Sequence, residues 1–183
     1  MYCEIQKKIL KFSTLNSLFN CYVRSKLEYC YLVWNPLYKN SIRAIDCVQS
    51  KFLRYCWYKF ISREPLSYRY HLALNEFYLV SLEDRRKFYS CVFLFKIFNN
   101  CINDVNLLAN INIRVPRNPN SRQKLLFSIP AAKSNYEFGT PFRRICSIYN
   151  DISSSLNEID LFNDSLKVFK TKLFLFLHSQ QSS

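Results

Sequence analysis

Glycine is almost absent from this chain, since Gly139 is the only one among its 183 residues. Glycine adopts the positive φ angles of tight turns and lets the backbone approach a phosphate group closely. Nucleotide-binding loops that need several glycines are therefore excluded, and a protein rich in tight β-hairpins is disfavoured. The scarcity favours a mainly helical fold whose side chains, rather than its loop backbone, contact a partner.

Positive charge is the second constraint, because 26 Lys and Arg residues stand against 13 Asp and Glu residues, a formal net charge of +13. Such an excess attracts polyanions, with nucleic acid first and an anionic membrane surface second, although a solvated basic surface would give the same balance. The densest segment runs from Arg114 to Arg144, where Glu137 is the single acid. Because no apolar run approaches the length of a membrane span, we expect no membrane partner.

The eight cysteines carry neither a metal-binding nor a secretory signature. No two of them are spaced C-x-x-C, which is the usual clamp for zinc. The first residues include Lys7, Lys8 and Lys11 but lack the apolar core of a signal peptide. We therefore expect free thiols and an intracellular protein, in the nucleus or cytoplasm, with disulfides as the alternative. No cofactor is predicted.

Helical periodicity dominates the sequence outside one proline-rich segment. We predict a mainly α fold, an irregular helical bundle with a short β-hairpin or extended segment around residues 109–140, where prolines exclude a long helix. The expected order is a truncated lead-in helix or linker (1–12), a helical bundle (13–108), a basic proline-rich extended segment (109–142), C-terminal helices (143–178) and a disordered tail (179–183).

Within the predicted bundle, the first helix should stop before Pro36, because proline disfavours helix at the preceding residue. Ser41 is the expected cap of the next helix, whose basic residues lie opposite its apolar stripe. Ser81 should open a third helix. Large rings need deep burial or a partner, so we expect Tyr29 and Trp34 to anchor the core.

No group of residues supports an active site. His71 is expected to pack or cap, and His178 lies in a segment expected to fray, so neither is predicted to act as a general base. The only adjacent acids, Glu83 and Asp84, are expected in one helical turn, where their side chains point about 100° apart and make a poor metal clamp. The sequence therefore predicts no enzyme, no catalytic residue, no metal site and no small-molecule substrate.

Several short motifs nevertheless occur in a recognisable order. They are YVRSKLEYC at Tyr22–Cys30, VWNP at Val33–Pro36, IxxIxxVQxxFLR at Ile42–Arg54, LxSLEDRR at Leu79–Arg86, YN at Tyr149–Asn150 and FKxxL at Phe169–Leu173. In this order the motifs resemble the C-terminal region of reverse transcriptases from non-LTR retrotransposons of the jockey type. The resemblance spans about residues 14–175.

In that family, the matching region is the thumb and the segment beyond it, and a thumb lies along the primer–template duplex and holds backbone phosphates. The palm's paired aspartates, in a Tyr/Phe-x-Asp-Asp turn, have no counterpart in this sequence. The resemblance thus implies a catalytically inactive fragment of an RNA-directed DNA polymerase that binds RNA/DNA duplex or another polyanion. A reverse transcriptase palm or a second copy of the chain are further expected partners. The alternatives are an orphan helical protein-interaction or self-associating module, or a relic with no selected function.

Basic residues inside the motifs and in the proline-rich segment are the candidate phosphate contacts, because Lys and Arg neutralise backbone charge whatever the base sequence. These nucleic-acid-binding candidates are Arg24, Lys26, Arg43, Lys51, Arg54, Arg85, Arg86, Arg114, Arg117 and Arg122. The structural alternative for some of them is an ion pair inside the bundle, in which Glu28 would accept Arg24 or Arg54.

Overall fold

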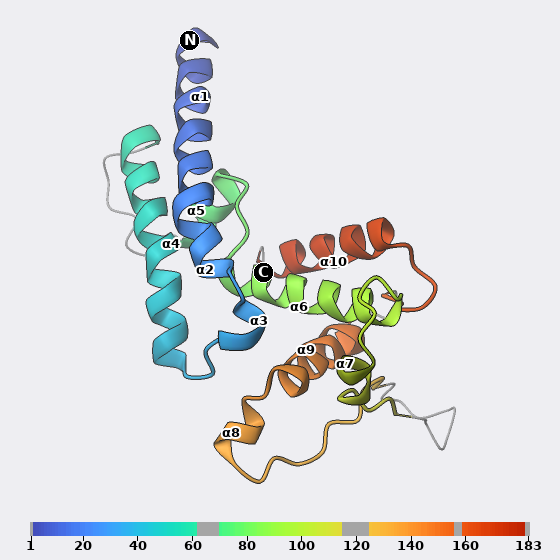
Figure 1. The fold of residues 1–183 in the computed structure, drawn as a ribbon. Helices are drawn as coiled ribbons and strands as arrows, with labels where there is room; N and C mark the ends of the chain where they lie inside the picture. Colours follow the sequence, from blue (N-terminus) through green and yellow to red (C-terminus); the bar gives the residue numbers. More distant parts are fainter. Residues whose placement is uncertain (1, 62–69, 115–124, 156–158, 182–183) are drawn as a thin grey trace. The chain divides into compact units, whose positions relative to one another are not determined.

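The computed structural model describes residues 2–61, 70–114, 125–155 and 159–181, and it confirms the mainly helical fold (Figure 1). The chain forms two compact units, Met1–Glu83 and Asp84–Gln181, called here the N-terminal and C-terminal units. We had expected one bundle over residues 13–108. The division falls at the start of α6 (Leu82–Phe98) instead, because residues further along α6 pack on the C-terminal helices, as the Phe95 and Phe169 rings do with 4.7 Å between centroids.

The N-terminal unit begins with one almost continuous helical segment. α1 (Tyr2–Phe19) passes through the π-helical turn η1 (Asn20–Arg24) into α2 (Ser25–Glu28). The chain then turns at Cys30, whose φ of 50° is left-handed, and enters α3 (Tyr31–Trp34). Helical structure thus ends before Pro36, as predicted.

The lone glycine takes no part in such turns. Gly139 has a φ of −82°, which any residue adopts. The positive φ angles of the described residues belong to Cys30, Tyr78 and Asn100. Left-handed backbone is less favourable for residues with a Cβ atom, so surrounding contacts must stabilise each of these turns.

α4 (Lys39–Phe60) lies beside α1 in the N-terminal unit (Figure 1), and α5 (Tyr70–Glu76) packs on it. Aromatic rings join these helices. Phe19 of α1 stacks on Phe52 of α4 with 4.1 Å between ring centroids. The core of this unit consists of Leu53, Cys56, Ala73, Leu74, Phe77 and Leu79.

Two details predicted for this unit are wrong. α4 begins at Lys39 directly after extended Tyr38, so Ser41 lies inside the helix and does not cap it. Tyr29 and Trp34 do not anchor the core, because their exposed fractions are 75% and 38%. Tyr29 lies between α2 and the turn at Cys30 with an extended backbone, so its ring is not on the packed side of a helix.

The C-terminal unit contains α6 and four later helices, which are α7 (Val105–Ala109), α8 (Asn135–Phe138), α9 (Pro141–Ser155) and α10 (Leu166–Gln181). α9 begins at Pro141, as expected of a proline in a first helical turn. α10 buries Phe169, Leu173 and Leu177. It continues to Gln181, so residues 179–181 of the expected tail are helical, whereas 182–183 lie outside the described residues.

The predicted β-hairpin is reduced, in the described part of the chain, to one antiparallel bridge between Ile113 and Phe127. Two backbone hydrogen bonds flank this bridge: Arg114 N–H donates to the Leu126 carbonyl and Ser128 N–H to the Asn112 carbonyl, both at 2.8 Å. The connecting residues 115–124 lie outside the described residues.

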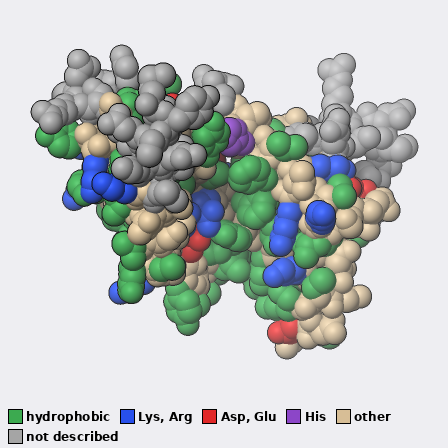
Figure 2. Space-filling view, turned by 90° about the horizontal axis from the view of Figure 1, so that it is seen from above, with side chains coloured by type: hydrophobic (Ala, Val, Ile, Leu, Met, Phe, Trp, Pro, Cys, Tyr) green, Lys and Arg blue, Asp and Glu red, His purple; other side chains and the backbone are tan. Residues whose placement is uncertain are grey.

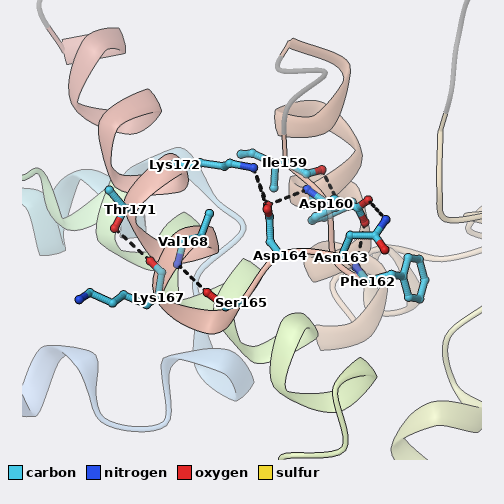
Figure 3. Close-up of polar contacts among 11 residues, drawn as sticks. Ile159, Asp160, Phe162, Asn163, Asp164, Ser165, Lys167, Val168, Thr171 and Lys172 are labelled. Carbon is cyan, nitrogen blue, oxygen red and sulfur yellow. Dashed lines mark hydrogen bonds and ion pairs between the residues drawn. The ribbon is translucent and has the colours of Figure 1, made fainter.

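In the loop before α10, the carboxylates of Asp160 and Asp164 accept hydrogen bonds from neighbouring residues, as Figure 3 shows. Asp160 accepts hydrogen bonds from the Phe162 backbone N–H at 2.8 Å and from the Asn163 side chain at 2.6 Å. The Phe162 N–H is the main reason why the pKa of Asp160 is lowered. Asp164 pairs with Lys172 of α10 at 2.7 Å. These acids therefore fix the entry into α10.

Candidate nucleic-acid interface

The amphipathic pattern of α4 creates the candidate surface. Its apolar stripe packs in the N-terminal core through Leu53 and Cys56, which have no exposed surface. A helix repeats every 3.6 residues, so residues between these positions must face solvent. Arg43, Lys51 and Arg54 are all exposed, as their spacing predicted.

We define the basic face of α4 as Arg43, Lys51 and Arg54, three exposed basic residues that lie within about 80° of one another around the helix axis. The helix contains one acid, Asp46, and that residue is half-buried. The exposed part of α4 therefore carries positive charge without an exposed carboxylate to neutralise it. On the side of the molecule drawn in Figure 2, Lys and Arg side chains lie among hydrophobic ones, and acidic side chains are few.

Spacing along α4 suits contact with a charged strand. Arg43 and Arg54 are eleven positions apart, which is about 16 Å along the helix axis at ~1.5 Å per residue. Lys51 lies one turn before Arg54, so two of the three charges are neighbours. A duplex strand carries a phosphate about every 3.4 Å along the helix axis, so side chains over this length reach several phosphates.

Lys39 and Lys59 add two exposed charges to α4 outside its basic face, and the sequence motifs did not select them. Both are exposed residues of α4. Lys59 lies beyond the IxxIxxVQxxFLR motif and Lys39 lies before it. The motif bounds left both lysines out, because the helix extends beyond the motif in each direction.

Two of the candidate arginines lie in the protein interior. The Arg24 side chain is 8% exposed, and its guanidinium carbon lies 5.7 Å from the centroid of the Phe19 ring, a cation–π contact at the end of η1. Arg86 of α6 is 5% exposed. A guanidinium buried to this extent is shielded from a phosphate in solvent, so both residues have structural positions.

Other candidates occupy separate places. Lys26 is an exposed residue of α2, and Arg114 is exposed beside the β-bridge. Arg85 is half-buried and donates a hydrogen bond of 2.9 Å to the Tyr89 hydroxyl, with its guanidinium over that ring. Arg117 and Arg122 lie outside the described residues. The structure therefore brings Arg43, Lys51 and Arg54 together on one helix.

The motifs that carry the resemblance also contain buried amides with packing roles. Gln49 of α4 accepts from Leu82 N–H at 3.0 Å and from the Tyr70 hydroxyl at 3.2 Å, and it donates to the Val80 carbonyl at 3.0 Å. Asn150 of α9 bonds both backbone groups of Phe127. Each of these two side chains hydrogen-bonds to backbone groups outside its own helix, a structural role that the residue spacing in the motifs did not reveal.

The thiols show no sign of activation. Cys21, Cys30, Cys47, Cys56, Cys91, Cys101 and Cys146 are free. Burial raises the pKa of Cys56 and of Cys146 from an ordinary value of 9.0 to about 11. A raised pKa disfavours the thiolate, which is the nucleophilic and metal-binding form. Among the described residues, no group of three or more His, Cys, Asp or Glu side chains could hold a metal ion.

No helix in the described part of the chain combines the length and the apolar character that crossing a membrane requires. Comparisons with protein-family models, with curated proteins and with solved structures found no match to this chain.

Proposed function

We propose that this chain is a thumb-like module of a non-LTR reverse transcriptase without catalytic activity of its own, and that it binds duplex nucleic acid through backbone phosphates. The basic face of α4 carries the proposal, because it gathers exposed Lys and Arg residues on one rigid helix. The IxxIxxVQxxFLR motif supports the same assignment, since it specifies the buried residues Gln49 and Leu53 of α4 and the exposed Arg54.

Side chains, rather than backbone loops, would make these contacts. Phosphate contacts from Lys and Arg position a protein on a duplex without reading its sequence. The single glycine is consistent with this mode, because backbone phosphate cradles usually need several. The proposed module therefore binds the backbone of a duplex and does not read its base sequence.

Binding to an RNA/DNA duplex should weaken steeply as salt is raised. If Arg43, Lys51 and Arg54 each neutralise one phosphate, the slope of log K against log salt is about −2.7, and a fourfold rise in salt costs about 40-fold in affinity. Fluorescence anisotropy with a labelled duplex from about 50 to 200 mM salt measures this slope. Affinity that stays flat over this range would contradict the proposal.

A variant with Arg43→Ala, Lys51→Ala and Arg54→Ala provides the positional test, because these exposed residues can be removed without opening the core. Its salt slope should become shallower by about three units, since each lost contact removes about one. The matched control changes Lys133, Lys167 and Lys170 of the C-terminal unit to Ala, which removes the same charge. Equal losses in both triple variants would show that binding follows net charge alone.

An exposed apolar patch favours self-association as a second candidate function. The patch consists of Tyr29, Val33, Trp34, Leu37 and Tyr38, which are 75%, 72%, 38%, 38% and 70% exposed. Exposed apolar side chains grouped in one segment are commonly covered by a partner, and aromatic residues are enriched in interfaces. A second copy of the chain would cover the patch without any further component.

Sedimentation velocity tests this candidate. We expect the sedimentation coefficient to rise with concentration in the micromolar range, and Val33→Asp with Leu37→Asp to shift the protein towards the monomer, because a buried unpaired carboxylate opposes association. The control is Val105→Asp, which changes an exposed valine outside the patch, with an exposed fraction of 81%. A monomer at every concentration would exclude the candidate.

A further inference from the structure

Two exposed tyrosines stand among the charges of the basic face of α4. Tyr55 is 52% exposed and Tyr58 is 60% exposed. They lie three positions apart, so their side chains are neighbours on one side of the helix. A surface that only had to attract phosphates would have no need of large exposed rings, which lose their apolar contacts in water.

Lys59 already engages one of these rings. Its ammonium donates a hydrogen bond of 3.2 Å to the Tyr55 hydroxyl and lies 5.4 Å from the centroid of the Tyr55 ring. Tyr58 has no ring, cation or hydrogen-bond partner among the residues that the structure describes. Tyr55 is therefore held in place by the helix, whereas the Tyr58 ring is open to an external partner.

Each tyrosine follows a basic residue by one helical turn. Lys51 precedes Tyr55 and Arg54 precedes Tyr58, in both cases by four positions, or about 6 Å along the axis. A nucleic-acid strand carries a matching pair of groups, because each negative phosphate lies beside a base with a flat π-face. In an intact duplex the bases are stacked inside, so an unpaired base is the part of the strand that such a ring reaches.

We propose that the basic face of α4 binds an unpaired strand next to a duplex, with a base stacked on Tyr58 and the adjoining phosphates held by Arg54 and Lys51. This inference rests on the proposed function, because it names the form of nucleic acid that the same face takes. Charge complementarity selects nucleic acid over an apolar partner, and the open ring selects a single strand over a continuous duplex.

The test compares three labelled nucleic acids with the full chain by anisotropy at about 50 mM salt. They are a blunt RNA/DNA duplex, the same duplex with an unpaired tail of about six nucleotides, and that duplex with an abasic tail of equal charge. We expect the base-bearing tail to bind about tenfold more tightly than the abasic tail, since one stacked base contributes about that much. Tyr58→Leu should abolish this difference and leave blunt-duplex affinity unchanged, whereas Tyr58→Phe should keep it.

Tyr136→Leu, at an 87% exposed tyrosine of the C-terminal unit, is the control and should change none of the affinities. Equal affinity for the two tails would overturn the inference, and so would a Tyr58→Leu variant that lowers all three affinities alike. An acidic polypeptide that competes as well as the tailed duplex would also overturn it. In each of these cases duplex binding itself can persist, but a lack of binding to all three molecules would contradict the proposed function as well.

Discussion

Replacing Gln49 with leucine should lower the free energy of unfolding of the N-terminal unit by about 3 kcal/mol, because buried groups that lose a hydrogen-bond partner cost about 1–3 kcal/mol each. Gln49 has no exposed surface. Its side chain accepts from Leu82 N–H and donates to the Val80 carbonyl, both at 3.0 Å. Leucine keeps the helix and most of the volume but leaves these two backbone groups without their partner. The expected loss is therefore a large part of an ordinary domain stability.

Urea unfolding followed by tryptophan fluorescence measures this change. Both tryptophans of the chain, Trp34 and Trp57, belong to the N-terminal unit, so the signal reports on the unit that contains Gln49. Asn40→Leu is the matched control, because it removes an exposed amide from the same helix. We expect the control to stay within about 0.5 kcal/mol of the natural chain. A Gln49→Leu variant as stable as the control would show that the three hydrogen bonds contribute little.

Periodicity predicted the exposed face of α4 because a helix translates sequence spacing directly into direction. Arg43, Lys51 and Arg54 lie opposite the buried positions Leu53 and Cys56, as expected. This inference needs only the helical repeat and no knowledge of neighbouring elements. For the same reason, the helical ends at Pro36 and Pro141 were predictable, since proline acts through its own ring and missing N–H.

The motifs could not decide whether Arg24 and Arg86 are buried, because burial depends on what packs around them, although an interior position was the structural alternative for Arg24. Their residue type suggested solvent, and the motifs suggested phosphate contact. Arg24 is covered where η1 continues α1, and it lies over the Phe19 ring, a contact that needs the π-helical turn to exist. Tyr29 shows the opposite error, because its ring suggested burial but the turn at Cys30 leaves it in solvent.

Local sequence patterns also could not show where the chain divides into its two units. Ser81 predicted the start of α6 correctly, but whether that helix belonged to the first bundle depended on its partners. Phe95 packs against Phe169, more than seventy positions later, with the two rings tilted, and Asn99 donates to the Leu161 carbonyl at 2.8 Å. Such long-range contacts leave no periodic signal in the sequence, so α6 was assigned to the helices before it.

Asn150 should be the most sensitive polar residue of the C-terminal unit, and Asn150→Leu should cost about 3 kcal/mol of unfolding free energy. Its amide accepts from Phe127 N–H at 3.1 Å and donates to the Phe127 carbonyl at 2.9 Å. The bridge hydrogen bonds near Ile113 use the residues on either side of Phe127. The N–H and carbonyl of Phe127 therefore depend on Asn150, which takes the place of a second neighbouring strand.

Thermal unfolding by circular dichroism measures the stability, and amide hydrogen exchange at Phe127 reports on the local contact. Exchange at this amide should become faster in Asn150→Leu, whereas Ser154→Ala, an exposed change in the same helix, should leave it unaltered. Unchanged protection of Phe127 in the leucine variant would contradict the assigned role.

The pH dependence of an Asn150→Asp variant should distinguish the hydrogen bond to Phe127 N–H from the one to the Phe127 carbonyl. An ionised aspartate still accepts from Phe127 N–H, but it faces the Phe127 carbonyl with a second acceptor, whereas a protonated aspartate can donate as the natural amide does. The folded state of this variant thus favours the protonated form, and its carboxyl pKa should lie above the unfolded value. Stability relative to the natural chain should then be nearly restored below the unfolded pKa and lost as the pH rises through the folded pKa. A variant as stable as the natural chain at every pH would mean that the carbonyl bond contributes nothing, and that Asn150 acts only as an acceptor for Phe127 N–H.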